Sequence, residues 1–174
     1  IYVGALLYAQ SFLVTHVNLE NDPNGSAVFA LGYQLFAMGI FVPGLLGNVV
    51  IPRLSRNRGG NHQTVQKLFM LYVALASGWI ATIFVLSPWI LRAYRLNADA
   101  TNLKVIFGMQ IAVLLASMNA LINQRLIADR RLTQLAFLSL LYLLVTIGCG
   151  FAFGFAVEIA AYYLNVAYVA VIAG

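Results

Sequence analysis

The side chains of this sequence that can do acid–base, nucleophilic or metal chemistry are few and far apart. Apart from Lys67, Lys104, Arg125 and Glu158 near the segment ends, the only titratable side chains other than tyrosines inside the long apolar segments are His16 and Cys149. The sequence has no H-E-x-x-H, G-x-S-x-G or P-loop motif, and no pair of carboxylates within an apolar segment. A single cysteine excludes an internal disulfide and offers no set of metal ligands. These residues predict a protein that is not an enzyme and that binds no metal or cofactor.

Uncharged polar side chains recur instead at helical spacing inside the apolar segments. Tyr8, Ser11 and Thr15 share one face of the first segment, and Gln34 and Asn48 lie near one face of the second. Within a bilayer such residues either form hydrogen bonds between helices or line a hydrated cavity, and both alternatives stay open. The candidate cavity residues are Tyr8, Ser11, Thr15, His16, Gln34 and Asn48.

Two further features belong to this polar set. His16 lies near the end of the first segment, where it is either a structural hydrogen-bonding residue or a proton relay. Gln110, Ser117 and Gln124 form one stripe on a later segment. The same two interpretations, contact between helices or cavity lining, apply to that stripe.

The composition identifies the environment of the chain. Hydrophobic residues make up 62% of the 174 residues and charged ones 9%, whereas soluble domains have about 45–50% and about 25%. The chain is therefore expected to be an integral membrane protein with the lipid bilayer as its partner. The net charge is +5, but so few charges give no continuous basic face, which argues against nucleic acid as a partner.

Six apolar segments, separated by polar, glycine-containing or charged connections, predict an all-α polytopic membrane protein. We expect a single bundle of six transmembrane helices over residues 1–174. Because the chain opens and closes within apolar runs, we also expect it to be a fragment of a longer chain. The expected helices are 1–17, 26–50, 64–91, 103–126, 132–153 and 156–174.

The second apolar segment is the most informative one. Residues 26–50 hold no charge, and a helix there would be roughly 37 Å long at about 1.5 Å per residue, enough to cross a hydrocarbon core about 30 Å thick. Pro43 lies inside it, with Gly44 and Gly47 close by. These three residues predict a bend, which is either a moving hinge or a static packing feature.

Positive charge gathers at two of the connections. Arg53 and Arg56 open the loop expected after residue 50, where they either bind phosphate bidentately or anchor the helix at the membrane rim. Seven cations flank this loop and the one after residue 126, namely Arg53, Arg56, Arg58, Lys67, Arg125, Arg130 and Arg131. The other connections hold only Arg92, Arg95 and Lys104. By the positive-inside tendency, the two cation-rich connections face the cytoplasm.

Motifs in the second segment resemble a known family. G-Y-Q-L-F at residues 32–36 is followed by F-V-P at 41–43 and by V-I-P-R-L-S-R at 50–56. Their order and spacing are similar to those of the polysaccharide (O-antigen, Wzx-like) flippases of the multidrug/oligosaccharidyl-lipid/polysaccharide exporter superfamily. In that family F-I-P precedes P-x-L-S-R at the cytoplasmic end of the eighth helix. The resemblance covers essentially the whole chain, as the second six-helix half of a protein with two such halves.

The resemblance implies a transporter that moves undecaprenyl-diphosphate-linked oligosaccharide across the inner membrane, for O-antigen and lipopolysaccharide biosynthesis, by alternating access between two halves. The missing N-terminal half of the same chain would be its partner. Because the first two segments hold no Arg or Lys at mid-depth, a cationic lining would come from that half, from His16, or from Arg53 and Arg56 at the rim.

Other functions stay open beside the flippase. A drug or small-metabolite exporter of the same superfamily predicts the same fold with a more apolar, aromatic lining. A membrane-embedded enzyme predicts clustered titratable residues, which the sequence does not have. A non-transport membrane scaffold is the remaining alternative.

Overall fold

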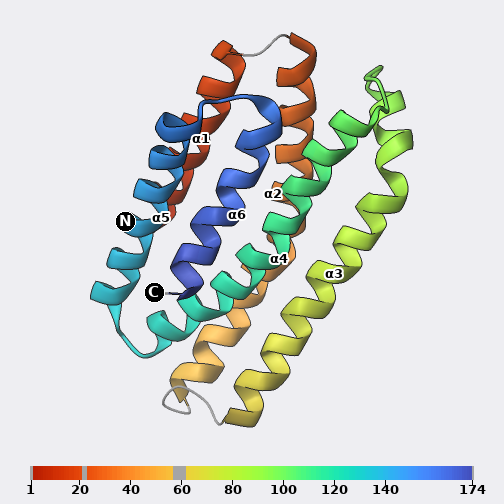
Figure 1. Ribbon diagram of the computed structural model, residues 1–174. Coiled ribbons are helices and arrows are strands. Elements are labelled where there is room, and N and C mark those ends of the chain that lie inside the picture. The colour runs from red at the N-terminus through yellow and green to blue at the C-terminus, as the bar shows by residue number, and fades with distance from the viewer. Residues whose placement is uncertain (1, 21–22, 57–61, 174) are drawn as a thin grey trace.

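The computed structural model describes residues 2–20, 23–56 and 62–173, and these residues form six helices and no strand. Successive helices run in opposite directions, so the bundle has an up-and-down arrangement (Figure 1). This confirms the all-α, polytopic fold class. The helices are α1 (Tyr2–Glu20), α2 (Pro23–Arg56), α3 (His62–Ala93), α4 (Ala100–Ala128), α5 (Leu132–Phe153) and α6 (Val157–Ala173).

Helix length and composition place the chain in a membrane. Within the described residues, four helices are long and apolar enough to cross one, namely α2, α3, α4 and α5. The helix α6 is apolar but has only 17 residues. The helix α1 has 19 residues and carries Gln10, His16 and Asn18. Spans by α1 and α6 therefore stay predictions.

The ends of the helices agree with the sequence in part. The helix expected over 132–153 is confirmed by α5, but α2 is longer than predicted, because it begins at Pro23 and continues through Pro52 to Arg56. A proline is well tolerated in the first turn of a helix, and Pro52 removes only one backbone donor near the other end. The prediction that Arg53 and Arg56 lie in a loop is wrong, since both belong to the last turn of α2.

The start of α4 shows why sequence periodicity misjudges such ends. This helix begins at Ala100, three residues before the predicted start. Asp99 is its N-cap, and the carboxylate of Asp99 accepts a hydrogen bond of 2.7 Å from the backbone N–H of Asn102. A capping side chain satisfies one of the free N–H groups of the first turn, so the helix extends back to the cap whether or not that turn is apolar.

The helix α4 lies at the centre of the bundle. It packs against α2, α3 and α6, while α6 packs between α4 and α5, and α1 rests mainly on α5 (Figure 1). Small side chains allow this close approach, because Ala160, Ala161 and Ala167 of α6 are fully buried. The consecutive helices α1 and α2 make few contacts with each other. The core therefore follows α4 and α6, and space is left between α1 and α2.

The connections fall at two opposite ends of the bundle. The end of α2, the start of α3 and the α4–α5 connection lie at one end, and the end of α1, the start of α2 and the α3–α4 and α5–α6 connections lie at the other (Figure 1). This arrangement brings Arg53, Lys67 and Arg125 toward the same end, as the sequence predicts. The assignment of that end to the cytoplasm stays a prediction.

Candidate functional site

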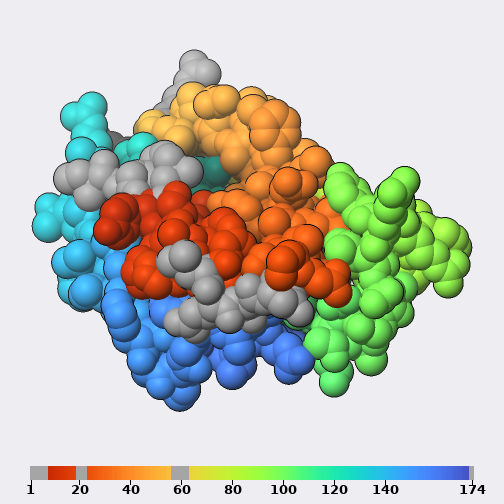
Figure 2. Space-filling view, turned by 90° about the horizontal axis from the view of Figure 1, so that it is seen from above, coloured from red at the N-terminus to blue at the C-terminus, as the bar shows by residue number. Residues whose placement is uncertain are grey.

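A cavity of about 500 Å³ lies between α1 and α2. Seen from the end where these helices are connected, α1 (red) lies next to the first half of α2 (orange) in Figure 2. The described lining consists of Gln10, Ser11, Val14 and Thr15 from α1 and of Ala30, Tyr33 and Gln34 from α2. Five of these seven residues have a polar side chain, and none of the seven is charged.

One hydrogen bond fixes the inner wall of this α1–α2 cavity. The hydroxyl of Tyr33 donates to Oε1 of Gln10 over 2.7 Å, and Gln10 is buried. Ser11, Thr15 and Gln34 are exposed. Two hydroxyls and one amide are therefore available to donate to and accept from a ligand, which suits an uncharged polar molecule.

The cavity unites some of the residues that the sequence predicts. Ser11, Thr15 and Gln34 line it together, as expected from their spacing. Gln10 and Tyr33 were missed, although each immediately precedes a predicted residue. A cavity between two helices takes side chains from two adjacent stripes of each helix, and a search for a single polar face finds only one of them.

The other predicted cavity residues lie elsewhere. Tyr8 has 63% of its surface exposed and does not line the cavity. Asn48 is exposed on α2, fourteen residues beyond Gln34 and therefore roughly 21 Å away along a helix that rises about 1.5 Å per residue. The structure thus does not gather the six predicted residues into one site.

His16 is half-buried and packs among aromatic rings. Its ring centroid lies 4.1 Å from that of Phe12 and 4.8 Å from that of Phe155, which follows α5. Nδ1 lies 2.9 Å from the carbonyl oxygen of Phe12. Because a carbonyl only accepts, Nδ1 carries the proton in this bond. These contacts support the structural interpretation of His16 over the proton relay.

The predicted hinge residues face different surroundings. Pro43 is buried, and its carbonyl oxygen accepts from the hydroxyl of Tyr72 at 3.3 Å and from Nε2 of Gln124 at 3.4 Å. A Cβ atom on Gly47 would lie 2.9 Å from Nε2 of Gln124, so Gly47 permits close packing of α2 on α4. A Cβ atom on Gly44 would meet nothing within 4 Å. Of the two glycines, only Gly44 faces open space.

The cations of the predicted rim are remote from the cavity. Arg53 is exposed in the last turn of α2, and the side chain of Arg56 lies outside the described residues. Arg53 follows Gln34 by nineteen positions, roughly 28 Å along a helix at about 1.5 Å per residue. A phosphate group at Arg53 would therefore not reach the side chains of the α1–α2 cavity directly.

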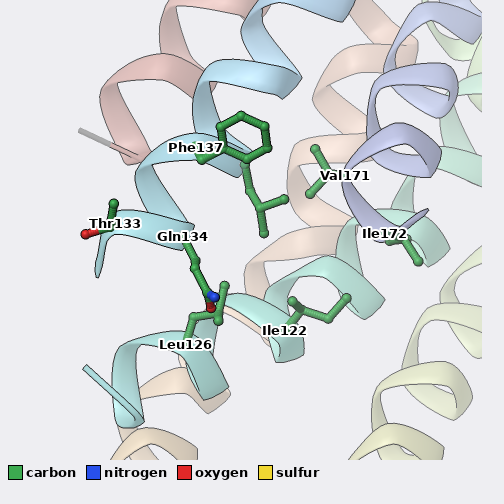
Figure 3. A pocket seen from close by; sticks show the side chains of 8 residues that line it. Ile122, Leu126, Thr133, Gln134, Phe137, Val171 and Ile172 are labelled. Carbon is green, nitrogen blue, oxygen red and sulfur yellow. The ribbon is translucent and has the colours of Figure 1, made fainter. Parts of the chain in front are cut away.

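Two other hollows differ from the α1–α2 cavity in their lining. One of about 430 Å³ shares Gln34 but is otherwise formed by Ala37, Met38 and Phe41 of α2. Another of about 580 Å³ lies between α4, α5 and α6, where Phe137 and Val171 face each other (Figure 3). Because its lining is mostly apolar, this second hollow resembles a surface that contacts lipid tails and is not assigned to the site.

Comparison with known proteins adds nothing to the motifs of α2. No protein-family model matches the chain, and no match was found among curated proteins or among solved structures. Among the described residues, no group of three or more His, Cys, Asp or Glu side chains is placed to hold a metal ion. The α1–α2 cavity, with its uncharged polar lining, is the candidate functional site.

Proposed function

We propose that this protein is a flippase that moves lipid-linked oligosaccharide across a membrane by alternating access. The observation that carries the proposal is the α1–α2 cavity, whose exposed Ser11, Thr15 and Gln34 are polar within an otherwise apolar chain. Polar side chains at membrane depth are costly unless they meet a partner or line a pathway. The motif resemblance of α2 to polysaccharide flippases supports the same class.

The chemistry of the lining suits a glycan. Hydroxyl and amide groups both donate and accept, and a sugar presents hydroxyls that do the same. The anionic diphosphate of the lipid carrier would instead be bound by cations of a second lobe of the same chain or by Arg53 at the rim. Because none of the described residues that line the α1–α2 cavity is charged, the proposed role of this lobe is to contact the glycan.

The proposed hinge is the segment around Pro43 and Gly44. Pro43 cannot donate a backbone hydrogen bond to the carbonyl of Gly39, and Gly44 has open space on its outer side. In the alternating-access scheme, the outer part of α2 changes direction there while the side of Gly47 stays packed on α4. The test places two spin labels on α2, one on each side of Pro43, and measures the distance between them. We expect a single distance distribution in the Pro43→Ala variant, narrower than that of the wild-type protein.

A small-molecule exporter of the same superfamily is the second candidate. The apolar hollow beside the cavity, with Met38 and Phe41 in its wall, shares Gln34 with it. An amphipathic compound would place its polar end at Gln34 and its apolar part against Phe41. A wholly polar glycan gains nothing from this hollow, so transport specificity separates the two candidates.

A reconstitution experiment tests the proposal. The full-length protein is placed in vesicles containing a fluorescent undecaprenyl-diphosphate-linked oligosaccharide, and translocation is followed by access of an impermeant glycosidase. We expect translocation to be slow in Gln34→Leu and unchanged in the control Thr82→Val. Thr82 is also an exposed polar residue, but it lies on α3 and bonds its own helix at Gly78 O over 2.8 Å.

Three results would argue against this function. Absence of glycolipid translocation by the wild-type protein contradicts it, and equal loss in Gln34→Leu and Thr82→Val contradicts the role of the α1–α2 cavity. The third result would favour the small-molecule exporter: the protein transports amphipathic cations and not the glycolipid, and the Phe41→Ala variant loses this transport.

A further inference from the structure

A proline in α3 leaves a backbone carbonyl without its usual partner. Pro88 lies inside α3 and has no N–H to donate to the carbonyl of Phe84, four residues earlier. The hydroxyl of Ser87 donates to that carbonyl oxygen over 3.1 Å, and Ser87 is 5% exposed. The proton of Ser87 is therefore committed to Phe84, while the lone pairs of its oxygen remain acceptors.

A buried amide on the neighbouring helix lacks a partner on one side. Gln110 of α4 is 1% exposed, and its Oε1 accepts from the indole N–H of Trp79 over 3.0 Å. An indole N–H can only donate, so this bond fixes the amide with Oε1 toward Trp79 and Nε2 on the other side. Nε2 has no hydrogen-bond partner in the protein. An unpaired buried donor costs free energy comparable to a lost hydrogen bond.

A small cavity joins these two groups. Its volume is about 30 Å³, and both Ser87 and Gln110 line it, together with apolar side chains that include Ile83 and Ile106. A cavity of about 10–15 Å³ or more can hold a water molecule, and a buried water needs at least two polar partners. This cavity therefore has room for a water and offers one donor and one acceptor.

We propose that a single ordered water molecule binds between α3 and α4, accepting a hydrogen bond from Nε2 of Gln110 and donating one to Oγ of Ser87. The hydrogen bonds then run in one direction, from Trp79 to Gln110, to the water, to Ser87 and to the carbonyl of Phe84. Ordered waters and serine side chains are among the groups that restore backbone bonding at prolines in membrane helices. The water links the break at Pro88 to the centre of the bundle.

Radiolytic hydroxyl labelling in H₂¹⁸O tests this site on the full-length protein in lipid nanodiscs. Radicals formed from a bound water label the side chains beside it even when they are buried. Ile83 is 4% exposed and Ile106 is 1% exposed, as is the control Leu164 on α6. We expect labelling of Ile83 and Ile106 to be several-fold faster than labelling of Leu164.

Two variants separate a bound water from general leakage. Ser87→Val fills the cavity and removes the acceptor, and Gln110→Met keeps the length of the side chain and removes the donor. Either variant should reduce labelling of Ile83 and Ile106 to the rate of Leu164. The second variant gives the answer if the first fails to fold. Equal labelling of all three residues in the wild type, or labelling unchanged in the folded variants, would overturn the proposal.

Discussion

Polar side chains on α4 and polar side chains at the α1–α2 cavity are of the same chemical types but have opposite surroundings. Gln124 and Gln110 of α4 are buried, and they accept hydrogen bonds of 2.7 Å from Tyr72 and 3.0 Å from Trp79 of α3. Gln34 on α2 is exposed and lines the cavity. A glutamine in an apolar segment therefore serves as a link between helices or as a cavity wall according to its neighbours.

Glycines of α2 mark the same division. A Cβ atom on Gly39 would lie 2.6 Å from Nε1 of Trp79, and one on Gly47 would lie 2.9 Å from Nε2 of Gln124. These two glycines make room for the side chains that link α2, α3 and α4. Gly44 lies between them in sequence but has nothing within 4 Å of its Cβ position. The inner face of α2 is thus closely packed, and its outer face is open.

The largest expected effect on stability comes from adding a methyl group to the closely packed inner face of α2. Gly39→Ala should lower the free energy of unfolding by about 1–3 kcal/mol, because the new methyl group overlaps Trp79 and a methyl of Val113. The matched control is Gly44→Ala on the same helix, which should leave stability unchanged or slightly raised, since alanine favours helix over glycine. Unfolding in mixed micelles measures both. Equal effects at the two positions would remove the contrast between the faces of α2.

A smaller contrast is expected between two tyrosine hydroxyls. Tyr72→Phe removes the donor to Gln124 and to the carbonyl of Pro43 and should cost about 0.6–1.7 kcal/mol of stability. Tyr33→Phe removes the donor to Gln10 but should cost less than about 0.5 kcal/mol, because water in the cavity can take the place of the hydroxyl. The same unfolding assay measures the loss of stability in both variants. A larger loss in Tyr33→Phe than in Tyr72→Phe would mean that the cavity holds no water.

Helical spacing identified some of the residues that share a cavity, but not their partners. Ser11, Thr15 and Gln34 were expected on cavity-facing stripes and do line one cavity. The period of a helix defines which residues share a face, whereas the neighbour of that face depends on the packing order of all six helices. The sequence therefore left open whether Gln110 links helices or lines a cavity, and only the position of Trp79 distinguishes the two.

His16 and the end of α2 are two further features that local sequence patterns do not predict. The packing of His16 depends on Phe155, which is 139 positions away in the sequence and beyond any local pattern. The helix α2 continues past Pro52, because this proline removes only one backbone donor and its fixed φ is compatible with a helix. Fold class and most of the helix ranges follow from long apolar runs, since the bilayer dictates their length.

Accessibility to water sharpens the comparison without relying on stability. In a Cys149→Ala background, Ser11→Cys should react several-fold faster with an impermeant thiol reagent than Ser117→Cys. Ser11 lines the cavity and is exposed, whereas Ser117 is fully buried and its hydroxyl donates to the carbonyl of Val113 over 2.7 Å. Thiolate formation needs water, so the rate reports hydration. Similar slow rates at both positions would mean that the cavity is closed in the membrane.

The smallest effect is expected at His16, because its contacts are those of a packed ring. His16→Phe keeps the aromatic contacts with Phe12 and Phe155 and loses only the bond from Nδ1 to the carbonyl of Phe12, which is also four residues earlier in the same helix. A side-chain bond within the protein has a net worth of about 0.5–1.5 kcal/mol, and the retained packing offsets part of its loss. Transport by His16→Phe should therefore show the pH dependence of the wild-type protein in the same vesicle assay. A pH profile that flattens in this variant would restore His16 as a proton relay, and would make the aromatic cluster, rather than the α1–α2 cavity, the place where transport is coupled to protons.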